Sequence, residues 1–309
     1  MVQHSAYFLQ IFLNIVQLAS FYAPLAVAFS LIQAITRRVF LSLGDFAMFG
    51  SFAAVYVCFG RLLQGDDDWQ AASISLLLAV LCAGALGKVT AKYVFAPMVK
   101  SSALAFMIAA IGFSIAIEEL MRLITESRDI WIPPLFQGQV MNLVDGDFPV
   151  HLSGNYAFAS LISALSIAAV FILVQFTHFG RKWQACSENL TLAKLCGVKT
   201  ETIIQQTFIV GAALSAVSGW MTAITYGGTN FSVGIMLGFK AMFAAVAGGF
   251  GNMRGAVVGA ISLAVLEVVW SAGFGTTYRD VGVFSAVVLV LLFRPEGLGG
   301  IRDMRESES

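Results

Sequence analysis

The sequence predicts an all-α integral membrane protein, and its composition carries the prediction. Of the 309 residues, 58% are hydrophobic and 12% are charged, and the mean hydropathy is +0.83. Soluble domains are about 45–50% apolar and about 25% charged, so the few charges here could not cover a soluble surface. Since a membrane helix needs about 20 apolar residues, we expect a polytopic bundle of about 8–9 transmembrane spans. Residues 1–309 then form a single transmembrane domain.

Nine apolar stretches can be marked along the chain, and each predicts a helix. The seventh is short and rich in glycine, which favours a broken or re-entrant element. The stretches cover residues 8–32, 39–60, 71–90, 101–121, 156–177, 203–225, 235–250, 255–272 and 281–293.

The connectors between these stretches alternate in charge. Those after the second and fourth stretches are acidic or poor in Lys and Arg, whereas those after the odd-numbered stretches are basic. Because cytoplasmic loops are rich in Lys and Arg, we expect the N-terminus outside and the C-terminus in the cytoplasm. Residues 125–155 are then an external loop and residues 179–202 a cytoplasmic one. The basic residues are Arg37, Arg38, Lys88, Lys92, Lys100, Arg181, Lys182, Lys194, Lys199, Arg254, Arg294, Arg302 and Arg305.

Several classes of function are excluded by what the sequence lacks. Eighteen basic residues are balanced by 18 acidic ones, so a nucleic-acid binder is not expected. The string from Gly84 to Val89 lacks the spacing of a phosphate-binding loop and the Ser or Thr that would hold Mg²⁺. The three His and four Cys show no metal-site spacing. We therefore expect no catalytic residue, metal or cofactor in this chain.

The cytoplasmic segment 180–200 predicts a short helix. Ser187 suits an N-cap, Glu188 suits the first turn, and Gly197 fits a left-handed stop, giving about ten residues. Ala193 and Gly197 lie four apart, so they could share a face that a partner approaches closely. An ordinary amphipathic surface helix is the alternative.

Five motifs resemble those of permease subunits of branched-chain amino acid ABC importers, of the LivH type. The similarity covers nearly the whole chain, and the lysine-bearing glycine-rich run is its most specific part. The motifs are GRKWQACSENLTLAKLCGVKT at 180–200, GFKAMFAAVAGGFGNMRGAVVGA at 238–260, TYRDVGVFSAVVLVLLFRPEGLGG at 277–300, ESRDIWIPPLFQGQ at 126–139 and SSALAFMIAAIGFSIAIEE at 101–119.

The resemblance implies a multi-pass subunit in the inner membrane of a bacterium that carries branched-chain or related small amino acids. It implies four further chains, namely a second permease in a heterodimer, two cytoplasmic ATPases holding ATP and Mg, and an external substrate-binding protein. The segment 180–200 would be the coupling helix that contacts an ATPase. Its residues would be Ser187, Glu188, Asn189, Ala193, Lys194 and Gly197.

One departure from the family pattern leaves the cargo open. Phe40 and Leu43 stand where such permeases carry an Asn and a His, ahead of Asp45. Urea, a short amide or another small polar metabolite is the alternative cargo. A different class, an ion-coupled secondary carrier, would use Asp45 and Glu267 as ion sites.

Among the charges inside apolar stretches are Asp45, Lys240 and Glu267, whereas Glu118 and Glu119 near the end of the fourth stretch are expected at the outer interface. A charge at the bilayer centre costs at least about 2.5–3.5 kcal/mol, so we expect Lys240 to pair with Glu267 or Asp45. Snorkelling of Lys240 to the interface is the alternative, and a third hypothesis places Lys240 and Asp45 on the path of a zwitterionic cargo. The strings at 44–49 and 238–243 match at four of six positions, which favours an inverted repeat.

Overall fold

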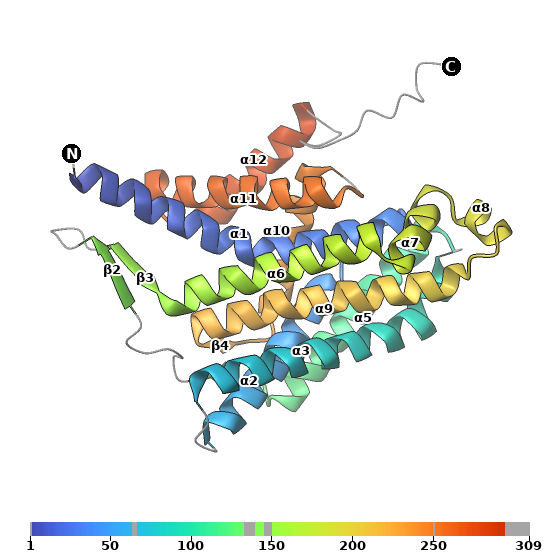
Figure 1. Ribbon diagram of the computed structural model, residues 1–309, viewed down its shortest axis with the longest axis horizontal. Coiled ribbons are helices and arrows are strands. Elements are labelled where there is room, and N and C mark those ends of the chain that lie inside the picture. Colours follow the sequence, from blue (N-terminus) through green and yellow to red (C-terminus); the bar gives the residue numbers. More distant parts are fainter. Residues whose placement is uncertain are drawn as a thin grey trace.

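The computed structural model describes residues 2–63, 67–99, 101–132, 140–144, 150–249 and 251–293, and most of these are helical. Seven helices in this part of the chain are long and apolar enough to cross a membrane, which confirms a polytopic helical membrane protein (Figure 1). They are α1 (Val2–Thr36), α2 (Leu43–Leu63), α3 (Asp68–Thr90), α5 (Ala103–Ile124), α6 (Gly154–Phe176), α9 (Thr200–Tyr226) and α11 (Met253–Phe274).

All nine apolar stretches form helices, but two of the helices are short. Helix α10 (Val233–Gly248) has 16 residues and α12 (Arg279–Phe293) has 15. At 1.5 Å per residue each rises about 22–24 Å, less than the roughly 30 Å of a hydrocarbon core. The count of 8–9 spans therefore resolves into seven full-length helices and two short ones within the described residues.

The remaining elements gather at the two ends of the bundle. At one end, β1 (Ile130–Trp131) pairs with β4 (Gly228–Thr229), and β2 (Val140–Val144) pairs with β3 (Val150–Ser153), both antiparallel. At the other end lie α7 (His178–Glu188) and α8 (Leu190–Leu195), away from the first turns of α1. A π-helix (Ala91–Phe95) and α4 (Ala96–Met98) continue α3. The membrane orientation stays a prediction, and Lys100, Arg294, Arg302 and Arg305 lie outside the described residues.

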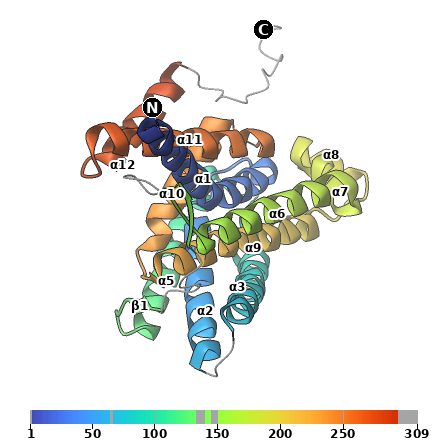
Figure 2. The same ribbon diagram turned by 60° about the vertical axis from the view of Figure 1, so that its left-hand side comes forward.

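Helices α1 and α9 form the centre of the bundle, between α11 on one side and α2 and α3 on the other (Figure 2). Small residues allow this close packing, because a Cβ added at Gly219 of α9 would overlap the backbone of Ala47 in α2. Trp220 is fully buried beside it and donates a hydrogen bond from Nε1 to Ser75 Oγ at 2.9 Å. The indole N–H of Trp220 is thus paired inside the bundle, as a membrane interior requires.

Helix α10 lies against α2 with almost no space between the two backbones. A Cβ at Gly44 would overlap the Gly234 carbonyl and come within 2.8 Å of the Gly238 Cα. The two similar strings at 44–49 and 238–243 are therefore neighbours in space, and their origin as an inverted repeat stays a prediction. Phe40, just before α2, is buried with its ring centroid 4.6 Å from Phe95 and 5.1 Å from Phe208.

Candidate functional site

The segment expected to contact an ATPase is two helices rather than one. Helix α7 runs on to Glu188, and Asn189 breaks the chain with extended φ and ψ of −157° and 110°. The expectation that Ser187 caps the second helix is wrong, because its hydroxyl bonds the Gln184 carbonyl at 2.8 Å inside the last turn of α7. Glu188 likewise ends α7 instead of opening α8. The physical reason is that Thr177 caps α7 ten residues earlier, so Ser187 is already inside a helix.

Helix α8 is six residues long and is capped at both ends. Asn189 Oδ1 accepts hydrogen bonds from the backbone N–H groups of Thr191 at 2.9 Å and Leu192 at 3.1 Å. At the other end Gly197 has φ +82°, as the predicted left-handed stop requires. Its N–H bonds the Lys194 carbonyl, and the Val198 N–H bonds the Ala193 carbonyl, both at 3.0 Å. These two bonds form a Schellman motif.

The caps present two leucines to the outside. Leu192 is 59% exposed and Leu195 is 79% exposed, with the exposed Lys194 between them. Ala193 is only 4% exposed and packs into the chain's own core, so the expectation that it shares an accessible face with Gly197 is wrong. The exposed surface of α8 is therefore formed by Leu192, Lys194 and Leu195, together with Thr191.

Two arginines of the connector between α1 and α2 donate hydrogen bonds to neighbouring segments at this end of the bundle. Arg37 Nη2 donates to the Glu188 carbonyl at 2.8 Å and to the Ser187 carbonyl at 3.3 Å, where the last carbonyls of α7 carry partial negative charge. Arg38 donates to the carbonyl of Met98 at 3.1 Å and to that of Ser101. The end of α1 is thus fastened both to α7 and to the segment that leads into α5.

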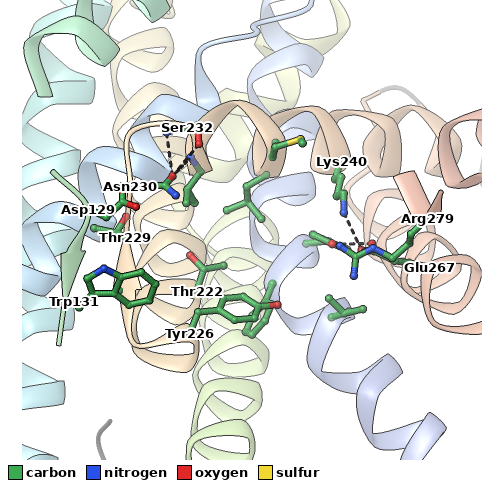
Figure 3. A pocket seen from close by; sticks show the side chains of 17 residues that line it. Asp129, Trp131, Thr222, Tyr226, Thr229, Asn230, Ser232, Lys240, Glu267 and Arg279 are labelled. Atoms are coloured by element: carbon green, nitrogen blue, oxygen red, sulfur yellow. Dashed lines mark hydrogen bonds and ion pairs between the residues drawn. The ribbon is translucent and has the colours of Figure 1, made fainter. Parts of the chain in front are cut away.

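Deeper in the bundle, the structure brings Lys240 and Glu267 together. Lys240 Nζ lies 2.8 Å from Glu267 Oε1, Arg279 Nε lies 3.1 Å from the same oxygen, and Tyr22 donates to Oε2 at 2.8 Å. Glu267 is 1% exposed, so its charge is satisfied entirely by protein groups. Figure 3 shows Lys240, Glu267 and Arg279 converging from α10, α11 and α12.

Asp280 completes this group, with Oδ1 at 2.9 Å from Lys240 Nζ. Lys240, Arg279, Glu267 and Asp280, called the charge cluster below, carry two positive and two negative charges. Tyr22 could not be singled out from the sequence, because it lies within an apolar stretch. Arg279 and Asp280 could have been found, since they are the first charges after Glu267 and directly precede the last apolar stretch.

The charge cluster borders a cavity of about 390 Å³. Figure 3 shows the cluster on one side of this cavity and Asp129, Trp131 and Asn230 on the other. Asn230 Oδ1 accepts from the backbone N–H groups of Ser232 and Val233 at 3.1 and 3.0 Å, which fixes the start of α10. The cavity is therefore polar at both ends and lies among α1, α9, α10 and α11.

Asp45 lies elsewhere, on the opposite side of α10. It borders a second cavity of about 200 Å³, formed by α2, α5 and α10, together with Ser114 and Glu118. Residues 234, 235, 238, 239 and 242 of α10 face this cavity, whereas residues 233, 236, 237 and 240 face the first. Helix α10 is thus the wall between the two cavities, and Lys240 does not pair with Asp45.

Comparison with known proteins decides the family. The family model described as "Branched-chain amino acid transport system / permease component" matches residues 11–293. The chain belongs to this family. Its members' description as permeases agrees with the seven apolar helices, and the protein is a multi-pass transport subunit of the bacterial inner membrane.

Individual relatives match this chain over most of its length. The high-affinity branched-chain amino acid transport system permease protein LivH of Salmonella typhimurium is 33% identical, over 97% of this chain and 98% of its own. The corresponding protein BraD of Pseudomonas aeruginosa is 30% identical over 95% and 96%. The autoinducer 2 import system permease protein LsrC of Photorhabdus luminescens is 25% identical, over 85% of this chain and 74% of its own.

Proposed function

We propose that this chain is the permease subunit of an ATP-driven importer for branched-chain or related small amino acids. The observation that carries the proposal is the match to LivH and BraD over nearly the whole chain. An external binding protein would deliver the cargo. A second permease would complete the membrane part, and two cytoplasmic ATPases would hold ATP and Mg.

The end of the bundle that holds α7 and α8 supports the coupling part of the proposal. Leu192 and Leu195 project from a helix capped at both ends, so they form a rigid apolar tip. An ATPase that moves this tip would move α7, and the Arg37 bonds to the last carbonyls of α7 would pass the movement to α1. Helix α1 in turn holds Tyr22 against Glu267. The motion would reach the charge cluster through this one helix.

The experiment reconstitutes the chain with its second permease, the ATPases and the binding protein in liposomes, and measures uptake of labelled leucine. We expect uptake that requires both ATP and the binding protein. Uptake of urea or a short amide in place of leucine would support an importer but with a different cargo. LsrC, a relative named for the import of autoinducer 2, is an example of a different cargo. Leucine uptake driven by a proton gradient without nucleotide would overturn the proposal in favour of a secondary carrier.

A further inference from the structure

The cavity beside Asp45 has the lining of a site for a small amphiphilic cation. Two carboxylates, Asp45 and Glu118, and the Ser114 hydroxyl border about 200 Å³ of space. Ile111, Ile115, Ile235 and Met242 contribute apolar walls. Of the described residues that border the cavity, none is basic. The site therefore combines negative charge with surfaces suited to a branched aliphatic group.

Asp45 lacks the partners that a buried carboxylate needs. Asp45 is 3% exposed, and Ser114 is its polar neighbour in the lining of the cavity. Its Oδ2 is buried and makes no hydrogen bond within the described part of the chain. Glu267 has the opposite status, because Lys240, Arg279 and Tyr22 occupy its oxygens. A buried charge without a partner is expensive, so Asp45 is the carboxylate that still requires a cation.

The Asp45 cavity opens on one face of the molecule. Ile111, Ile115 and Phe239 rim it and are 43%, 56% and 44% exposed, so it opens at the outer surface of α5 and α10. Ionisable side chains in membrane helices face a bundle interior or an aqueous cavity rather than lipid. Asp45 can therefore be reached from the face formed by α5 and α10.

We propose that this cavity binds the ammonium group of an aliphatic amino acid in transit, with Asp45 as its counter-ion and Ser114 as a hydrogen-bonding neighbour. Glu118 adds negative potential, and the isoleucines receive the branched side chain. The proposal rests on the proposed function, since it names the residues that meet the imported solute. It assigns no cargo contact to Lys240, whose charge is already neutralised within the charge cluster.

The test uses the whole transporter and the variants Asp45→Asn and Asp45→Glu. Loss of one charged hydrogen-bonding contact is expected to weaken leucine binding about 10- to 100-fold in Asp45→Asn, whereas Asp45→Glu stays within about threefold. Binding is measured on the purified complex without the binding protein, with leucine and with 4-methylpentanoate, which keeps the branched chain and carboxylate but lacks the amine. In the wild type we expect leucine to bind and 4-methylpentanoate not to compete.

The matched control is Glu119→Gln. Glu119 neighbours Glu118 on α5, but it is exposed and pairs with Arg122 at 3.2 Å, so its loss leaves leucine binding unchanged. If Asp45→Asn fails to assemble, Ile115→Trp narrows the cavity from its rim without altering the carboxylate and is expected to reduce binding at least about tenfold.

Three results separate the ways in which the account could fail. Normal leucine binding in an assembled Asp45→Asn or Ile115→Trp complex overturns the ammonium site. Equal competition by 4-methylpentanoate, with binding that depends on sodium or protons, overturns it in favour of an inorganic cation at Asp45. Absence of ATP-dependent leucine uptake by the wild-type complex, in contrast, contradicts the proposed function itself.

Discussion

The two buried carboxylates Glu267 and Asp45 differ in whether other side chains neutralise them. Glu267 accepts contacts from Lys240, Arg279 and Tyr22, and the charge cluster around it is neutral. Asp45 keeps one oxygen without a hydrogen bond and borders a cavity. The first arrangement joins helices, whereas the second leaves a charge for a ligand. The distinction rests on partners and not on burial, since both residues are almost fully buried.

Breaking one side of the charge cluster is expected to destabilise the protein. Lys240→Met leaves Glu267 and Asp280 short of a cation and should lower the free energy of unfolding by about 3–5 kcal/mol. In Lys240→Met with Glu267→Leu, one charge of each sign is removed, so the loss should be clearly smaller than the sum of the two single losses. Denaturant unfolding of the purified protein measures both. Additive losses would show that the two side chains do not act as a pair.

At the scale of helices, the sequence allowed some features to be predicted and hid others for physical reasons. Apolar runs of about 20 residues predicted the long helices, because burial in lipid demands them. Gly197 could be predicted as a stop because a left-handed backbone favours glycine. The prediction of Ser187 as a cap was wrong because Ser, Thr and Asn all cap helices, and tertiary structure selects Thr177 and Asn189 here.

The candidate site likewise includes features that the sequence predicted and features that only the structure shows. A lone Lys between two carboxylates along the chain left its partner open, and only the packing of α10 between two cavities assigns it to Glu267. Tyr22 carries no signal in sequence, since a tyrosine in an apolar stretch is common. Ala193 has the small size expected at a close contact, but its partner is the chain's own core and not another protein.

The link between α7 and α1 can be tested at this scale. Arg37→Gln removes charged donors from two carbonyls at an exposed helix end, so it should cost less than about 1 kcal/mol of stability. We expect leucine uptake per ATP hydrolysed to fall severalfold while ATPase activity persists. Arg181→Gln is the control, because Arg181 lies on α7 and contacts His178 of the same helix. An unchanged uptake-to-ATP ratio in Arg37→Gln would show that α1 does not receive movement through this contact.

At the scale of the whole molecule, the few charged side chains lie at the places to which we assign a function. Only 12% of residues are charged. Among the described residues, the buried charged side chains lie in the charge cluster or beside the Asp45 cavity, on opposite sides of α10. Helix α1 runs from the α7 contact at Arg37 past Tyr22 and connects the end of the bundle that holds α7 and α8 with the charge cluster. With a chain made almost wholly of membrane helices, ATP hydrolysis and cargo capture are assigned in our proposal to separate proteins.

The most direct test of that proposal measures leucine uptake and ATP hydrolysis together in the reconstituted complex. The double variant Leu192→Asp with Leu195→Asp places charge on the exposed tip of α8, and the methionine pair at the same positions serves as the control. We predict that the aspartate pair lowers both leucine uptake and the stimulation of the ATPase by the binding protein at least about tenfold. A tenfold loss corresponds to about 1.4 kcal/mol of coupling free energy. The methionine pair should resemble the wild type. Full ATP-driven uptake in the aspartate pair would contradict the account.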